Sequence, residues 1–299
     1  MKIKDIGSLF GLAALWGASF LFIRIASPVL GPFLTIQGRV TIAAIALLIY
    51  IVFTGRSADF KTRWKQYLIL GALNAAIPFM LIATAAIHLN ASVSAILNSL
   101  TPLFSALVAW GWMKEKLTLR KWIGIIIGIV GVTILVGWSS ISLTLEVIAA
   151  VGLSILSTVS YGFGGVYAKK VFVGVPPLSV AVGQQIGASV LLLPFTLFNL
   201  PTSMASLTSA AIFSVVGVAI FCTALAYPLF FYLITSAGPT KTQSVTLLIP
   251  LFGMIWGVIF LDEKITVGMI TGLIVILGSI FLIYDIRPRP TKSKQVKIY

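Results

Sequence analysis

The sequence predicts an all-α integral membrane protein with ten transmembrane helices in two inverted five-helix repeats and both termini in the cytoplasm. Three observations predict this architecture. Hydrophobic residues make up 59% of the chain and charged residues only 9%, whereas a soluble domain carries about 25% charged residues. Long apolar runs follow one another with short connections. One phrase of the sequence also occurs twice.

The apolar runs match the length that a bilayer demands of a spanning helix, about 20 residues. Ten runs are of about this length, and no soluble domain is inserted between them. The first run is followed by many others, so we interpret it as a spanning helix and not as a cleaved signal peptide. The predicted spans are 5–26, 33–54, 66–87, 90–112, 119–137, 146–168, 177–198, 209–234, 239–261 and 265–285.

The basic residues predict the orientation, because Lys and Arg in short loops stay on the cytoplasmic side. With the N-terminus inside, 18 of the 21 basic residues fall in cytoplasmic segments, and Arg24, Arg39 and Lys264 do not. We therefore assign the net charge of +14 to orientation and to anionic lipid headgroups, and not to nucleic acid. The cytoplasmic residues are Lys2, Lys4, Arg56, Lys61, Arg63, Lys65, Lys114, Lys116, Arg120, Lys121, Lys169, Lys170, Lys241, Arg287, Arg289, Lys292, Lys294 and Lys297.

The repeated phrase reads TPLFSALVAWGWMKEKLT at 101–118 and IPLFGMIWGVIFLDEKIT at 249–266, an offset of 148. Each half then holds five spans, 5–137 and 146–285, and a basic cytoplasmic tail follows at 286–299. An odd number of spans inverts the second half.

Inversion predicts that Glu115 and Glu263 lie at opposite faces of the membrane. Such repeats are typical of secondary transporters, and a duplication kept only for packing is the alternative.

Several motifs together resemble the drug/metabolite transporter superfamily, of the EamA type. They are LWGASF at 15–20, Arg39 in the second span and the paired endings PLF…E-K-x-T…G. The resemblance covers nearly the whole chain. It implies a bundle around a central cavity, alternating access by rocking of the two halves, and small organic substrates such as amino acids, often exported. Gln184 stands where Arg39 would align in the second repeat, so the cavity is expected to be only pseudo-symmetric.

Polar and aromatic side chains inside spans are the candidates for the substrate cavity, because such groups are costly unless they face protein or water. Arg39 offers a forked donor for a substrate carboxylate; the alternative is an arginine that snorkels or binds helix-end carbonyls. The amides can bind substrate or link helices, and the aromatic rings can line the cavity or only pack. The predicted cavity residues are Trp16, Ser19, Arg39, Asn74, Asn98, Tyr161, Gln184, Tyr227 and Gln243.

Two prolines inside spans, Pro102 and Pro250, are related by the offset of 148. Each lacks a backbone donor and can bend its helix. We expect them to bend the fourth and ninth spans near the cavity. Glycine pairs at four-residue spacing permit close helix packing, within a monomer or in a homodimer.

The chemistry that the sequence lacks narrows the function. All seven acidic residues lie at span ends or in loops, and the chain has one cysteine and one histidine. We therefore expect no metal, no cofactor and no proton relay in the spans, so uniport or exchange is as consistent with the sequence as antiport. The expected partners are a small-molecule substrate and lipids of the cell membrane. A membrane-embedded enzyme acting on lipid and a structural or receptor protein are the alternatives.

Overall fold

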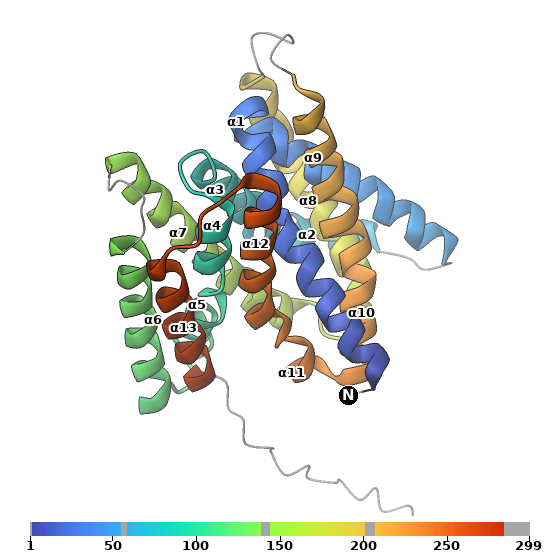
Figure 1. Ribbon diagram of the computed structural model, residues 1–299. Helices are drawn as coiled ribbons and strands as arrows, with labels where there is room; N and C mark the ends of the chain where they lie inside the picture. The colour runs from blue at the N-terminus through green and yellow to red at the C-terminus, as the bar shows by residue number, and fades with distance from the viewer. Residues whose placement is uncertain (1, 55–58, 139–143, 201–206, 284–299) are drawn as a thin grey trace, which may run out of the picture.

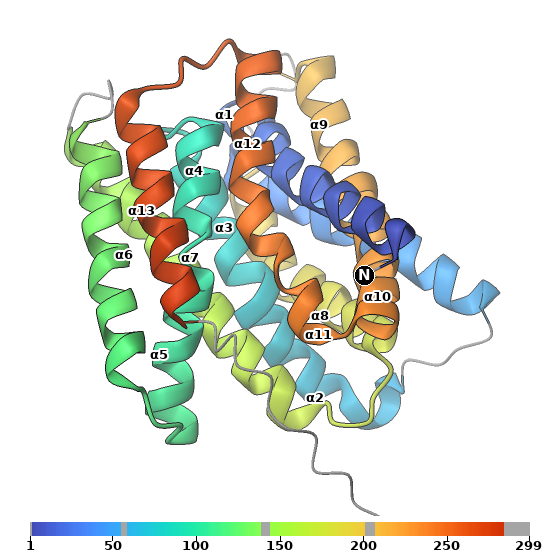
Figure 2. The same ribbon diagram turned by 60° about the horizontal axis from the view of Figure 1, so that its bottom comes forward.

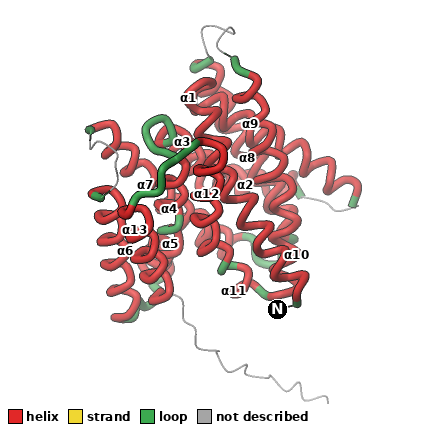
Figure 3. Tube along the Cα trace, viewed as in Figure 1, coloured by secondary structure: helices red, strands yellow, loops and turns green. Residues whose placement is uncertain are grey.

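The protein is a bundle of helices joined by short connections (Figure 1). The computed structural model describes residues 2–54, 59–138, 144–200 and 207–283, and this part of the chain contains no strand (Figure 3). Seven of its helical segments are long and apolar enough to cross a membrane. The expected all-helical membrane architecture is therefore confirmed. The tail 286–299 lies outside the described residues.

The first helix, α1 (Ile3–Phe53), is 51 residues long, which at about 1.5 Å per residue is more than twice the hydrocarbon thickness of about 30 Å. It changes direction at Gly31, whose φ of 75° and ψ of 157° are not helical. Pro28 and Pro32 flank this residue, and Pro32 has no N–H to continue the helix. The first two predicted spans are thus two helices that meet at a kink at Gly31 and share the label α1 (Figure 1).

Two of the long segments contain a π-helical turn. In the first, η1 (Ala72–Ala76) joins α2 (Phe60–Gly71) to α3 (Ile77–Ala85). In the second, η3 (Ile220–Leu225) joins α9 (Ser209–Ala219) to α10 (Ala226–Ala237).

A proline follows each π turn, Pro78 after η1 and Pro228 after η3. A proline cannot donate to the carbonyl four residues before it, so one helical hydrogen bond is already missing near each π turn. Widening the helix there therefore breaks few additional backbone hydrogen bonds. Side chains satisfy nearby carbonyls: Ser160 Oγ donates to Leu73 O at 2.7 Å, and Thr223 Oγ1 donates to Val218 O at 3.0 Å.

The fourth and ninth predicted spans are both interrupted. The turn Ser99–Leu100 separates α4 (Ala91–Asn98) from α5 (Thr101–Met113), and Pro102 stands at the start of α5. Gln243 and Ser244 separate α11 (Pro239–Thr242) from α12 (Val245–Leu261). Pro250 lies inside α12 and not at the interruption. The helix breaks lie before Pro102 and, further away, before Pro250, and the bending of these two spans by the prolines near the cavity stays a prediction.

The remaining helices are α6 (Leu119–Gly137), α7 (Leu145–Val171), α8 (Pro177–Phe198) and α13 (Val267–Ile283). Helices α6 and α13 lie side by side at one edge of the bundle (Figures 1 and 2). Glycines permit this approach: a methyl group added at Gly131 would lie 3.1 Å from Ile276 N, and one at Gly272 would lie 2.9 Å from Leu135 Cα. These glycines serve packing within one chain.

The repeated phrase folds in the same way twice. Lys114 and Asp262 end α5 and α12 in the left-handed conformation, with φ of 56° and 52°. Thr118 and Thr266 then begin α6 and α13, and each side chain accepts a bond from the backbone N–H three residues later. The connection 114–118 and the connection 262–266 lie at opposite ends of the bundle (Figure 2).

The apolar core is divided among several clusters. One is formed mainly by α4, α5, α6, α7 and α13, around Leu97 and Ile276. Another lies between α1, α3, α8 and the α9–η3 segment, around Ile36, Phe79 and Cys222. The second cluster surrounds the candidate site.

Candidate functional site

Arg39 lies in the second part of α1 and is only 6% exposed. Its guanidinium carbon is 3.6 Å from the centre of the Phe79 ring, and its Nε donates to Thr223 Oγ1 at 3.4 Å. The hydroxyls of Tyr161 and Tyr227 are close enough to interact with its charge. The one carboxylate–cation pair within 4.0 Å in the described part of the chain is Lys169–Glu115, so Arg39 has no carboxylate partner there.

A chain of hydrogen bonds runs beside Arg39 from the first π turn to α10. Asn74 Nδ2 donates to Gln184 Oε1 at 2.9 Å, and Gln184 Nε2 donates to the Tyr227 hydroxyl. Gly164 lets α7 approach this chain, because a methyl group there would lie 2.8 Å from Asn74 Cβ. Neutral donors and acceptors from both halves of the chain therefore meet next to one buried positive charge. We call Arg39, Asn74, Tyr161, Gln184 and Tyr227 the Arg39 cluster.

Some members of this region were not among the predicted cavity residues. Gln185 is fully buried and lies beside Tyr227. Phe79 and Thr223 contact Arg39 directly. One signal was available for Thr223: it stands four residues before Tyr227, on the same helical face.

The predicted aromatic residues occupy two neighbouring places. Tyr161 packs edge-on against Phe79, with ring centres 6.3 Å apart, and so joins the Arg39 cluster. Trp16 packs on Phe230 at 5.3 Å. Ser19 donates to the Trp16 carbonyl at 2.6 Å, a bond within α1.

Two further predicted cavity residues, like Trp16 and Ser19, have no hydrogen bond to this cluster. Asn98 ends α4, and its Oδ1 is buried without a partner. Gln243 is exposed in the break between α11 and α12. The expectation that Gln243 lies inside a continuous spanning helix is wrong, because the helix is interrupted there.

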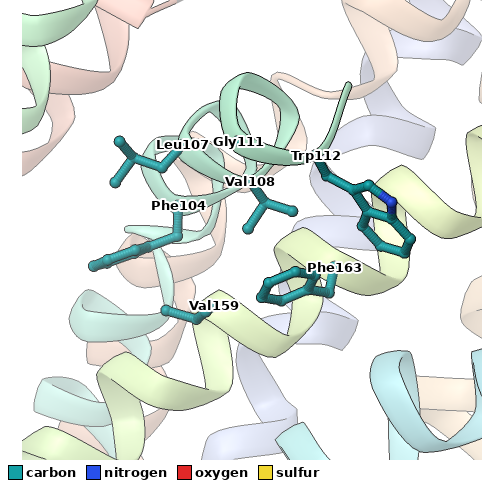
Figure 4. A pocket seen from close by; sticks show the side chains of 7 residues that line it. All are labelled: Phe104, Leu107, Val108, Gly111, Trp112, Val159 and Phe163. Atoms are coloured by element: carbon teal, nitrogen blue, oxygen red, sulfur yellow. The ribbon is translucent and has the colours of Figure 1, made fainter. Parts of the chain in front are cut away.

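A hollow of ≈ 500 Å³ lies between α5 and α7, away from the Arg39 cluster (Figure 4). Its lining is apolar, and Trp112 packs on Phe163 at one side of it with ring centres 5.7 Å apart. A smaller hollow of ≈ 130 Å³ lies between α5, α6 and α7. Neither includes a residue of the Arg39 cluster, whose central arginine is packed among protein atoms in this conformation. The lining residues of the first are Phe104, Leu107, Val108, Gly111, Trp112, Val159 and Phe163.

The described residues contain no group of three or more His, Cys, Asp or Glu side chains that could hold a metal ion.

The model of the EamA-like transporter family matches residues 5–137 and again 148–285. The chain belongs to the EamA-like transporter family. The expected family is thereby confirmed.

Named relatives of this EamA-like transporter agree with a membrane transport role. The uncharacterized transporter YvbV of Bacillus subtilis (strain 168) is 28% identical over 96% of this chain and 91% of its own length. Protein PecM of Dickeya dadantii (strain 3937) is 24% identical over 96% of this chain and 93% of its own.

The uncharacterized inner membrane transporter YedA of Escherichia coli (strain K12) is 25% identical over 84% of this chain and 81% of its own. A crystal structure of a protein with 17% identity has the same fold, with a TM-score of 0.65 over 94% of this chain and 96% of that one. The protein is therefore a membrane transporter by family.

At one end of this EamA-like bundle, a carboxylate from the repeated phrase binds the first turn of α4. Glu263 Oε1 accepts from Ala91 N at 2.6 Å, and Oε2 accepts from Ser92 N at 3.0 Å and from the Ser92 hydroxyl. Asn90 Oδ1 accepts from Val93 N at 2.8 Å. The first N–H groups of α4 are thus satisfied, two of them by a residue of the other half of the chain.

Proposed function

We propose that the protein is a secondary transporter that moves small carboxylate-bearing metabolites, amino acids among them, across the cell membrane as an exporter or exchanger. It works by alternating access around the Arg39 cluster. The observation that carries the substrate proposal is the buried Arg39 guanidinium without a carboxylate partner. A buried charge is costly unless it is paired, and a substrate carboxylate supplies the missing partner through a forked pair of hydrogen bonds.

The proposed topology has ten crossings in two inverted halves. It follows if α1 crosses twice, once on each side of Gly31, and if α12 and α13 cross as well. Two features support the halves: the family model matches the chain twice, and the two copies of the phrase have the same capping geometry. The opposite positions of the two connections (Figure 2) support the inversion.

The proposed orientation places both termini in the cytoplasm. One end of the bundle holds Lys114 and Lys116 in the connection 114–118 and Arg120 and Lys121 in the first turn of α6, whereas the connection at the other end holds Lys264 beside Asp262 and Glu263. An excess of Lys and Arg marks the cytoplasmic side. The end that carries Glu263 is then the outer end.

The chemistry beside Arg39 refines the substrate. The acidic residues in the described part of the chain lie at helix ends or in connections, and none contacts the cluster. A substrate ammonium group would find aromatic faces and amide oxygens there but no carboxylate. An organic anion whose remaining groups are uncharged fits the cluster best, and a zwitterionic amino acid fits it less well.

The test is uptake of radiolabelled candidates into proteoliposomes, after a thermal-shift screen of metabolites has found binders. Arg39→Gln removes the charge and is expected to abolish uptake; Arg39→Lys keeps the charge but loses the fork and is expected to retain a small part. Arg24→Gln is the matched control, because Arg24 binds the carbonyls of Ala86 and Ile87 at the end of α3. Wild-type rate and affinity in Arg39→Gln would show that Arg39 only packs.

A further inference from the structure

The contact between Glu263 and α4 joins the two halves of the chain at the end of the bundle where α12 is connected to α13. Its three hydrogen bonds to Ala91 and Ser92 involve a charged acceptor, and such bonds are stronger than neutral ones. Glu263 is half-buried and not enclosed, so water can replace the N–H groups when the contact breaks. The contact therefore has the properties of a reversible link and not of a permanently buried ion site.

Small residues hold the same end together just beneath this contact. A methyl group at Gly257 would overlap the Glu263 carboxylate and lie 2.8 Å from Ser92 Oγ. One turn further in, a methyl group at Gly253 would overlap Ala95 of α4. On the other side of α12, a methyl group at Gly17 would lie 2.8 Å from Phe252 Cβ. Helices α1, α4 and α12 can thus meet closely only because these positions are small.

The contacts that the structure describes at the pseudo-equivalent end differ from these. At the offset of 148, the counterpart of Glu263 is Glu115, which pairs with Lys169 at 3.0 Å in an exposed position. The counterpart of Gly257 is Ala109, whose methyl group occupies the place that Glu263 needs at the other end. The counterpart of Ala95 is Gln243, which is exposed. The two ends carry the same phrase, but in the part of the chain that the structure describes only the Glu263 carboxylate accepts hydrogen bonds from the backbone of the other half.

We propose that Glu263 is the latch of the outer gate: its carboxylate holds the first turn of α4 while the transporter is closed to the outside, and it releases α4 when the outer end opens. This inference rests on the proposed alternating access. Gly257 makes room for the latched carboxylate. At the other end, the methyl group of Ala109 takes the equivalent space, so Glu115 cannot bind in the same way. The protein without substrate therefore favours the state that is closed to the outside.

The test measures the distance across the outer end without any substrate. Spin labels are placed on His88→Cys and Lys264→Cys, two exposed positions on either side of the contact, in the full-length protein in nanodiscs. Cys222 is buried, and a sample without added cysteines checks that it stays unlabelled. In wild type we expect mainly the short distance. In Glu263→Gln we expect the ratio of long to short distances to rise by about tenfold or more, from the loss of charge-assisted bonds.

Three further variants, one of them a control, separate a latch from a simple helix cap. Gly257→Ala displaces the carboxylate without changing any charge and is expected to raise the long-distance population as Glu263→Gln does. Gly278→Ala is its control, since nothing lies within 4 Å of a methyl group there. Asp262→Asn removes a neighbouring charge and is expected to leave the distances unchanged.

Unchanged distances in both Glu263→Gln and Gly257→Ala, with folded protein, would overturn the latch and leave Glu263 as a cap of α4. That result leaves the transport proposal intact, because uptake into proteoliposomes is measured separately. Absence of uptake with a clear change in distances would instead contradict the transport proposal and leave the gate.

Discussion

Arg39 carries a full charge into the protein interior with little to balance it. Its contacts are one long hydrogen bond to Thr223 and the face of Phe79. A cation over an aromatic ring gains about 2 kcal/mol or more when it is desolvated, which is less than a buried charge costs without a partner. An anionic substrate would supply the stabilisation of the Arg39 charge that these contacts do not provide.

The absence of an acid at this cluster gives a prediction about ligand charge. Within each pair of a 2-hydroxy acid and the amino acid with the same side chain, the hydroxy acid is expected to bind about tenfold more tightly, because the ammonium loses water without gaining an ionic partner. Thermal-shift titration of the purified protein with several such pairs measures this. The corresponding alcohols, which lack the carboxylate, are expected not to bind. Tighter binding of the amino acids throughout would contradict the proposed charge preference.

A second prediction at this scale concerns Tyr227. Its hydroxyl accepts from Gln184 Nε2, so Tyr227→Phe leaves a buried donor without its acceptor. The expected cost is about 1–3 kcal/mol in the free energy of unfolding, seen as a lower melting temperature. Tyr232→Phe is the control, because Tyr232 is 42% exposed and water can replace its bond to Asp5. Equal effects of the two changes would contradict the prediction.

At the scale of elements, the packing of α6 on α13 depends on glycines. Gly131→Ala would force its methyl group against Ile276, and overpacking of this kind costs about 1–3 kcal/mol. We expect a lower melting temperature for this variant. Gly137→Ala, in the same helix, has nothing within 4 Å of the added methyl group and is expected to change little. A loss of stability of the same size in Gly137→Ala would show that the effect of Gly131→Ala does not depend on contact with Ile276.

Elements with a local cause were predictable from the sequence, and those with a distant cause were not. The endings of α5 and α12 follow from the repeated phrase, because a turn and a capping threonine are encoded within a few residues. The π turns were not predicted, since an extra residue in a helix leaves no mark on an apolar run. The chain from Asn74 to Gln184 and Tyr227 joins residues up to 153 positions apart, and single-sequence periodicity cannot pair them. Gln243 was placed wrongly because its helix breaks without a proline at the break.

For the whole molecule, the distribution of basic residues predicts which end faces the cytoplasm. The cysteine of a Lys264→Cys variant is expected to react with a membrane-impermeant thiol reagent added to intact cells. The cysteine of a Lys116→Cys variant, in the connection at the opposite end, is expected to react only after the cells are opened. Labelling in the reverse pattern would invert the proposed orientation.

Coupling is also a property of the whole molecule. The described spans hold no carboxylate away from their ends, and proton-driven carriers commonly use such a group or a histidine as a relay. We therefore expect the uptake rate in proteoliposomes to be the same with and without a pH gradient. A strong acceleration by the gradient would show that a proton site exists that these residues do not reveal.

The joint at Gly31 has a mechanical consequence. Residues 3–30 contact α12 through Gly17, whereas residues 32–53 carry Arg39. Rotation about the two backbone torsions of Gly31 lets the first part tilt with α12 while the second part stays packed against α8 and α9. A rigid 51-residue rod would move the guanidinium through several ångströms whenever its far end swung. Under the proposed alternating access, the pivot would allow the fixed charge to remain at one depth in the membrane while the cluster opens first to one side and then to the other.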